Sequence, residues 1–222
     1  MRQLYHFAID PACRKVRIIL GEKGLAHELR SEKVWERRQA FLQLNPAGEV
    51  PVLLDEDGTS VAGTRVISEY LEEAYGGPSL LGESPIDRAE VRRLEDWFDV
   101  KFRREVTANL VDEKILKRLL GQGQPDSGAI RAGLSNIRYH LDYIGWLNER
   151  RKWLAGDYLS RADIAAAAQL SAVDYLGDVP WDDHAGAKDW YARIKSRPAF
   201  RPILGDSISG IRAPKHYADL DF

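Results

Sequence analysis

The sequence contains very little cysteine, almost no net charge and no long apolar run. Cys13 is the only cysteine among 222 residues, so an internal disulfide cannot form and a zinc site of the cysteine type has no ligand set. The first ten residues, MRQLYHFAID, lack the apolar stretch of a signal peptide. No segment approaches the roughly 18 apolar residues of a membrane helix. These absences predict a cytoplasmic protein without membrane insertion.

The balance of charge also excludes classes of partner. Lysine and arginine number 32 and aspartate and glutamate 34, which gives a net charge of -2. Proteins that bind nucleic acid or anionic membranes usually carry a basic excess, so we expect neither partner. The histidines are scattered without the paired spacing of metal ligands, and we expect no metal site; they are His6, His27, His140, His184 and His216.

The N-terminal third alternates strand and helix signals. RQLYHFAI is typical of a buried strand, and the next segment has Asp10 as a helix N-cap, Pro11 in the first turn and Gly24 as a stop. HELRSEKV is a candidate second strand, and NPAGEVPVLLDEDGTSVAG contains two short strands joined by DEDG. Thr64 can cap a further helix, RVISEYLEEAY. This order predicts a mixed α/β domain over residues 1–76.

The remainder of the chain is predicted to be helical. GGPSLLGESP is rich in glycine and proline, which predicts a linker at 77–86. Beyond it, apolar residues recur at helical spacing in two long segments separated by GQGQPDSG. Ser160 and Asp163 form a capping-box pattern before an alanine-rich helix that should be buried. We therefore expect an all-helical domain over 87–204 and a tail over 205–222.

Three groups of motifs together resemble the cytosolic glutathione transferase superfamily. They are DPACRKVRIIL, then NPAGEVPVLLDEDG with GTRVISEYLEE, and finally LSRADIAAAAQLSAVDYLGDV with WYARIKSRPAFRPIL. The resemblance covers residues 1 to about 204. It implies a thioredoxin-like N-terminal domain, an all-helical C-terminal domain, a cleft between the two and a homodimer. It also implies a cis peptide bond between Val50 and Pro51.

The family resemblance also implies a glutathione site. Family members stabilise the glutathione thiolate with a hydroxyl group, or use a cysteine, near the N-terminus of the first helix. Here the candidates are Cys13, whose pKa the helix dipole could lower, and Tyr5 in the first strand. Both have a plainer interpretation as packed core side chains. Val50 and Pro51 would hold the cysteinyl backbone of glutathione, and Thr64 its γ-glutamyl carboxylate.

One position departs from the family pattern. Family members carry an acidic residue before the hydroxyl residue that starts the third helix, and that acid holds the glutathione ammonium group. Gly63 occupies this position and supplies no charge. Loss of one charged hydrogen bond costs roughly 1.5–3 kcal/mol, so affinity should fall about 10- to 150-fold.

The tail GDSISGIRAPKHYADLDF has two halves of different character. Glycine, serine and proline in the first half predict a flexible or extended tether. The second half alternates apolar and acidic side chains, as in a short peptide that binds a groove; these residues are Tyr217, Asp219, Leu220, Asp221 and Phe222. Two alternatives are a terminus without function and a tail that folds back over the cleft between the domains.

The glutathione motif and the tail together resemble the FtsZ-binding, glutathione-transferase-like division proteins of alphaproteobacteria. That resemblance implies binding to FtsZ polymers. Trp35, surrounded by charge in SEKVWERRQ, is either a second partner contact or a side chain buried against the helical domain.

Two hypotheses about function follow from the sequence. One is a non-catalytic dimeric adaptor without a cofactor, and the other is a glutathione-dependent enzyme that conjugates glutathione or transfers thiols.

Overall fold

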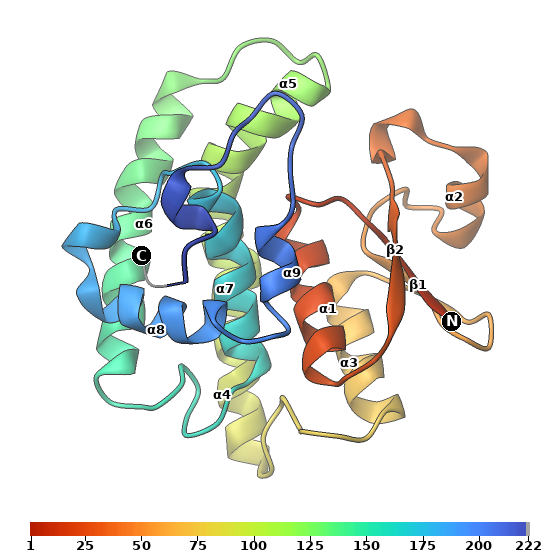
Figure 1. Cartoon of the computed structure of the whole chain (residues 1–222), viewed down its shortest axis with the longest axis horizontal. Helices are drawn as coiled ribbons and strands as arrows, with labels where there is room; N and C mark the ends of the chain where they lie inside the picture. The colour runs from red at the N-terminus through yellow and green to blue at the C-terminus, as the bar shows by residue number, and fades with distance from the viewer. Residues whose placement is uncertain (221–222) are drawn as a thin grey trace.

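The computed structural model describes residues 1–220 and contains a small mixed sheet beside a larger helical body (Figure 1). The first part has the order β1 (Arg2–His6), α1 (Pro11–Glu22), β2 (His27–Ser31), η1 (Val34–Glu36), α2 (Gln39–Leu44), β3 (Val52–Leu54), β4 (Ser60–Ala62) and α3 (Thr64–Ala74). The second part has α4 (Pro85–Asp96), η2 (Trp97–Leu116), α5 (Lys117–Leu119), α6 (Ser127–Asn148), α7 (Arg161–Asp174), η3 (Trp181–Asp183), α8 (Ala185–Lys195), α9 (Arg201–Leu204) and η4 (Lys215–Tyr217). Of the η elements, η2 is a π-helix and the other three are 3-10 helices. The predicted mixed α/β domain followed by helices is confirmed.

The sheet has the strand order β2-β1-β3-β4. β1 runs parallel to β2 and antiparallel to β3, and β3 pairs antiparallel with β4. The parallel pair requires a crossover, and α1 supplies it. As predicted, Asp10 caps α1, because its Oδ1 accepts a hydrogen bond of 2.8 Å from the Cys13 amide. This cap fixes the start of α1 next to the end of β1.

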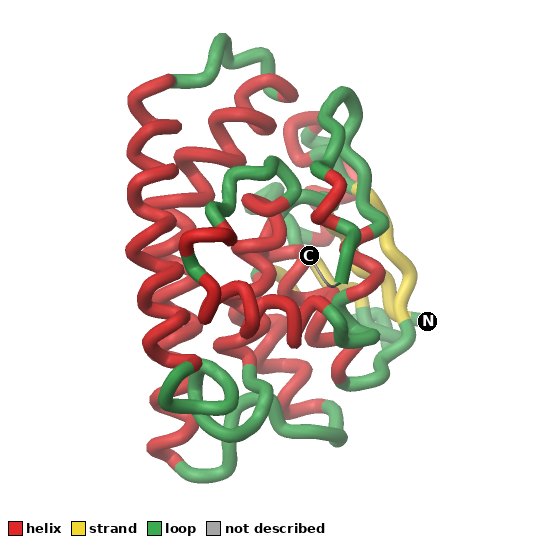
Figure 2. Tube along the Cα trace, turned by 60° about the vertical axis from the view of Figure 1, so that its left-hand side comes forward, coloured by secondary structure: helices red, strands yellow, loops and turns green. Residues whose placement is uncertain are grey.

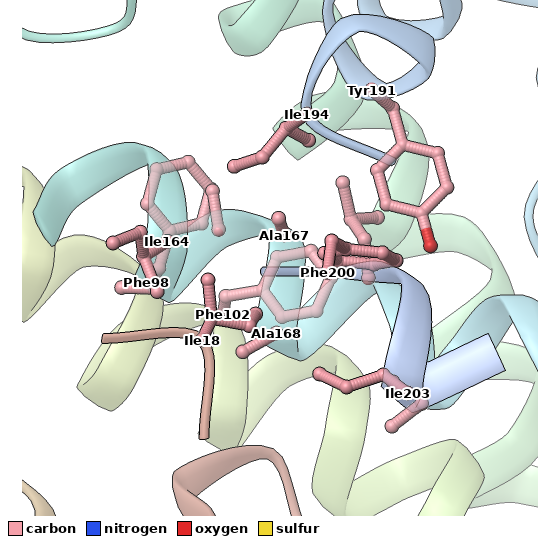
Figure 3. Packing of buried hydrophobic residues seen from close by; sticks show 14 of the residues in the cluster. Ile18, Phe98, Phe102, Ile164, Ala167, Ala168, Tyr191, Ile194, Phe200 and Ile203 are labelled. Carbon is pink, nitrogen blue, oxygen red and sulfur yellow. The ribbon is translucent and has the colours of Figure 1, made fainter. Parts of the chain in front are cut away.

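The helical body is built around α7. One long continuous helix is formed by α4, η2 and α5 in succession. It runs beside α6, so that two long helices lie side by side (Figure 2). Every residue of α7 is buried, and its small alanines let neighbouring helices approach closely. Ala167 and Ala168 of α7 lie near Phe102 of η2 and Ile194 of α8 (Figure 3). Ile18 of α1 joins the same cluster, so one core spans both parts of the chain.

The connection between α3 and α4 is shorter at its far end than the sequence indicated. α3 ends at Ala74 and α4 begins at Pro85, so Pro85 and Ile86 lie in the first turn of α4 rather than in a linker. The reason is local: Ser84 and Asp87 form a capping box, and Pro85 is favourable at the first helical position.

The tail is not the flexible tether that its composition predicted. Residues 205–220 pack along the helical body (Figure 1, dark blue). Tyr217 is 1% exposed, its ring meets that of Tyr175 edge-on at 5.2 Å, and its hydroxyl donates to the carbonyl of Ile203 at 3.2 Å. Tyr217 is therefore an internal anchor and not an exposed peptide side chain. Asp221 and Phe222, predicted to bind a partner, lie outside the described residues.

Two buried histidines make this fold sensitive to acid. Burial lowers the pKa of His140 to about 4, and burial together with the nearby Arg17 lowers the pKa of His6 to about 4. An unfolded chain binds these protons near pH 6.5, so the unfolded state gains protons before the native state does as the pH falls. Stability should therefore decrease from about pH 6.5 towards pH 4, by up to about 1.4 kcal/mol per pH unit for each histidine. Urea unfolding monitored by circular dichroism measures this slope, and a flat profile would contradict it.

Candidate functional site

Three segments that contain predicted glutathione-binding residues, namely the first turn of α1, the Val50–Pro51 bond and the start of α3, lie together in the structure. The Val50–Pro51 peptide bond is cis, as predicted. The Gly63 amide donates a hydrogen bond of 3.0 Å to the Pro51 carbonyl, which places the start of α3 beside this bond. The Thr64 hydroxyl donates to the Ala12 carbonyl at 3.3 Å and so connects α3 to the first turn of α1. The residues predicted to bind glutathione at the start of α3 and before β3 are thus adjacent to the first turn of α1, and together they form the assembled site.

The residue that caps α3 is not the predicted one. Gly63 is the N-cap, and Thr64 is the first residue of the helix. Gly63 has φ of 90°, a conformation that glycine adopts easily and side-chain-bearing residues rarely adopt. The Thr64 hydroxyl is used by Ala12 and not by the helix amides. The missing acidic side chain at Gly63 is therefore matched by a backbone conformation that disfavours one.

Cys13 does not have the properties of a reactive thiol. Its side chain is fully buried, and its Sγ accepts a hydrogen bond of 3.4 Å from the Phe7 amide. Burial and the neighbouring Asp10 carboxylate raise the pKa of the Cys13 thiol well above its usual value. The lowering by the helix dipole does not occur, first because burial disfavours the charged thiolate and second because the Asp10 carboxylate adds negative charge nearby. The thiol stays protonated and out of contact with solvent.

Tyr5 lies on the sheet face opposite to Leu4 and His6, because side chains alternate along β1. Its ring is 5.7 Å from that of Phe41 in α2. Cys13, in contrast, lies on α1, close to the main chain that follows β1. The Tyr5 ring and the Cys13 sulfur therefore have different contacts.

Trp35 is half-buried beside the assembled site. Its ring packs edge-on against Phe7 at 5.6 Å, and Phe7 is the residue whose amide contacts the Cys13 sulfur. The segment around Trp35 is held by the ion pair between Arg38 and the fully buried Glu32. Its ring contact is therefore within the N-terminal part, and part of its surface faces solvent.

At the far end of the chain, Asp219 is exposed and Leu220 is half-buried. The Asp219 amide donates to the His216 carbonyl at 3.1 Å, which continues the turn begun at Tyr217. These two residues adjoin the internal anchor Tyr217. They lie in a different part of the chain from the glutathione motifs and from Trp35. The predicted partner-binding residues therefore occupy two separate regions.

Sequence reasoning missed the buried charged residues that connect distant segments. Asp174 lies in the alanine-rich helix and was given no role, but its carboxylate contacts Trp181 and His216. Lys195 is fully buried and donates to the His216 carbonyl. A signal was present, because a charged residue inside an alanine-rich buried helix requires polar partners. The partner His216 could not be identified from the sequence, since it lies 42 residues from Asp174.

Residues 1–220 lack a cluster of metal ligands and a membrane-spanning helix. In this part of the chain, no three histidine, cysteine, aspartate or glutamate side chains come together in a way that could hold a metal ion. None of the helices described there is long and apolar enough to cross a bilayer.

Comparison with known proteins identifies the family. The family model for the glutathione S-transferase N-terminal domain matches residues 4–79, and that for the C-terminal domain matches residues 138–198. FtsZ-localized protein A of Caulobacter vibrioides is 50% identical over 224 residues, which cover 100% of this chain and 98% of that protein. The crystal structure of a glutathione S-transferase from Rhodospirillum rubrum is 58% identical with a TM-score of 0.98, and covers 100% of both chains. The structure of FzlA from C. crescentus is 50% identical with a TM-score of 0.96, and covers 100% of this chain and 99% of that one. The chain therefore belongs to the glutathione S-transferase superfamily.

Proposed function

We propose that this protein is a non-catalytic cell-division adaptor that binds FtsZ filaments at the division site. The observation that carries the proposal is its similarity, over its whole length and including the tail, to FtsZ-localized protein A. The glutathione site supports the same conclusion. Gly63 supplies no charge for the glutathione ammonium group, and the buried Cys13 thiol is protonated.

The chemistry of the site also argues against transfer to glutathione. Catalysis requires a group that stabilises the glutathione thiolate. The Cys13 sulfur is buried, the Thr64 hydroxyl is bonded to Ala12, and the Tyr5 ring packs on α2. The Cys13 sulfur and the Thr64 hydroxyl are therefore already engaged by contacts inside the protein. The proposed adaptor function therefore needs no cofactor.

A second candidate function is glutathione S-transferase activity, either conjugation or thiol transfer. It is favoured by the cis Pro51 bond, which still adjoins the start of α3, and by the similarity to the Rhodospirillum rubrum protein. In that case Val50 and Pro51 would hold the glutathione backbone, and Thr64 would lie at its carboxylate.

Partner contacts are proposed at two places. One is Trp35, whose ring is partly exposed at the edge of the N-terminal part. The other is the end of the chain, where Asp219 and Leu220 are followed in the sequence by Asp221 and Phe222. Apolar side chains next to acidic ones suit a peptide that enters a groove. Tyr217 would act here only as the anchor that holds this segment to the body.

We also propose a homodimer that uses the aromatic face of the helical body. On α6, Tyr139 is 61% exposed and Trp146 is 48% exposed, and Val100 of η2 is exposed as well. The rings of Trp97, Tyr143 and Trp146 follow one another, with centroid distances of 4.6 and 6.1 Å. Exposed aromatic side chains of this kind are enriched at protein interfaces. A dimer presents two tails, and linked weak sites bind a filament more tightly than either site alone.

The dimer proposal predicts the effect of one substitution. Tyr139→Glu places a charge on the exposed aromatic face, where burial in an interface would be costly, and should convert the dimer to a monomer. Sedimentation velocity measures the change. Glu149→Ala, at an exposed position beyond the end of α6, is the control and should remain dimeric. A dimer that persists in Tyr139→Glu would contradict this interface.

The proposed function is tested by co-sedimentation with FtsZ polymerised by GTP, together with calorimetric titration of glutathione. We expect the protein to pellet only with polymer and to give no binding heat with glutathione. Trp35→Ala should weaken pelleting while the chain stays folded, with a small fall in melting temperature from the lost contact with Phe7. Glutathione binding with turnover of an electrophile, and no pelleting, would overturn the adaptor and establish the transferase.

A further inference from the structure

The base of the tail is tied to both parts of the chain. Both carboxylate oxygens of Asp206 accept hydrogen bonds from Arg17 of α1, at 2.7 and 3.0 Å. The Tyr175 hydroxyl accepts from the Ile208 amide at 2.8 Å and donates to the Ile211 carbonyl at 3.0 Å. The segment from residue 206 to 211 is therefore held by side chains of α1 and of the residue that follows α7. Figure 1 shows it passing from α9 across the helical body.

Asp174 holds the next part of the tail. It is fully buried at the last position of α7, and its Oδ1 accepts from the indole Nε1 of Trp181 at 2.8 Å and lies 2.9 Å from Nε2 of His216. With the Asp174 oxygen as the acceptor, the donor in this contact is Nε2 of His216. A negative charge at a helix C-terminus opposes the helix dipole. Helix stability does not account for Asp174, whereas its contacts with the Trp181 indole and with the tail do.

Lys195 binds the same tail residue from the other side. It is fully buried at the end of α8, and its Nζ donates to the main-chain carbonyl of His216 at 2.8 Å. Asp174 therefore holds the side chain of His216 and Lys195 holds its backbone. The following residue, Tyr217, is packed against Tyr175 and bonded to Ile203. Residues 216 and 217 are thus fixed to α7, α8 and α9 together.

The chain leaves this fixed point at Ala218, which is exposed, as is Asp219. We propose that Asp174 is a positioning residue for partner binding: by holding His216 it fixes where the end of the chain leaves the body. This inference rests on the proposed function, because it assigns the partner contact to that end. A segment whose base is already ordered loses less conformational entropy on binding than a free one. Releasing the one or two residues at this base should weaken partner binding roughly 10-fold.

The test compares two substitutions of His216. Leucine cannot donate to Asp174, whereas glutamine keeps an N–H donor of similar reach. In His216→Leu, hydrogen exchange of the amides in 206–220 should accelerate, and FtsZ co-sedimentation should weaken about 10-fold. His216→Gln should restore both values towards those of the unchanged protein. Lys215→Leu makes the same kind of change at the exposed neighbouring position and should leave the exchange unaltered.

The outcomes separate this inference from the proposed function. Unchanged exchange in His216→Leu would show that Asp174 does not hold the tail. Faster exchange with full FtsZ binding would overturn the positioning role but leave the adaptor intact. Failure of the unchanged protein to pellet with FtsZ would overturn both. Loss of binding with no rescue by His216→Gln, or a large fall in the melting temperature of His216→Leu, would assign a purely structural role to the pair.

Discussion

Replacement of Lys15 by methionine should lower the free energy of unfolding by roughly 3–5 kcal/mol. Lys15 lies on α1 and is almost completely buried, and its Nζ contacts Glu95 Oε1 at 2.8 Å and Asp99 Oδ2 at 2.5 Å. Burial by itself lowers the pKa of Lys15, but Asp99 and Glu95 raise it above its usual value, so the group is charged. Methionine keeps much of the side-chain volume but leaves Asp99 without this cation. Chemical unfolding of the purified variant measures the loss.

The matched control for this change is Lys33→Met. Lys33 also forms an ion pair, at 3.2 Å to Glu36, but its side chain is 60% exposed. Exposed pairs contribute about 0–1 kcal/mol, because water and salt screen them. Adding Asp99→Asn to Lys15→Met should recover part of the loss, since no unpaired charge then remains at Asp99. Equal effects of Lys15→Met and Lys33→Met would show that the charge between α1 and the helical body is not buried.

Asp163→Ala should also cost roughly 3–5 kcal/mol, because it leaves several buried donors without an acceptor. Asp163 is fully buried in the first turn of α7. Its carboxylate accepts from the Leu154 amide at 2.8 Å, from the Trp190 indole at 2.9 Å, and from the Ser160 amide and hydroxyl at 3.1 and 3.0 Å. Chemical unfolding followed by tryptophan fluorescence measures the loss.

The chain offers a control with the same motif at the surface. Asp87 accepts from the Ser84 amide at 3.1 Å and from its hydroxyl at 2.6 Å, in an exposed capping box. Asp87→Ala should therefore destabilise much less than Asp163→Ala, because water can satisfy the freed donors. Similar losses at the two positions would mean that capping, and not burial, determines the effect.

The features that the sequence predicted correctly depend on short-range chemistry. Asp10 caps α1, Ser160 and Asp163 form a capping box, and the Val50–Pro51 bond is cis, each within a few residues of the signal. Thr64 was predicted to cap α3, but Gly63, which has a positive φ, is the cap. A cap is recognisable from composition, but its exact position depends on one backbone angle.

The features that the sequence did not predict depend on burial and distant contacts. The helix-dipole argument for Cys13 was local, and desolvation by the surrounding core outweighs it. The tail was predicted to be flexible because glycine, serine and proline favour that state. Its actual anchors are Tyr175 and Asp174, which lie in another part of the sequence. Composition describes what a segment does alone, and these contacts determine what it does on the folded body.

The most direct test of the central proposal compares the full chain with one that ends at Ala218 in co-sedimentation with FtsZ polymer. The shortened chain keeps the side-chain contacts of Tyr217 and His216 and loses the bond from the Asp219 amide to the His216 carbonyl, so the melting temperature should change little. We predict that the full chain pellets with FtsZ and that the shortened chain stays in the supernatant. Equal pelleting of the two chains would contradict a partner site at the end of the tail. Pelleting of neither would contradict the adaptor function itself.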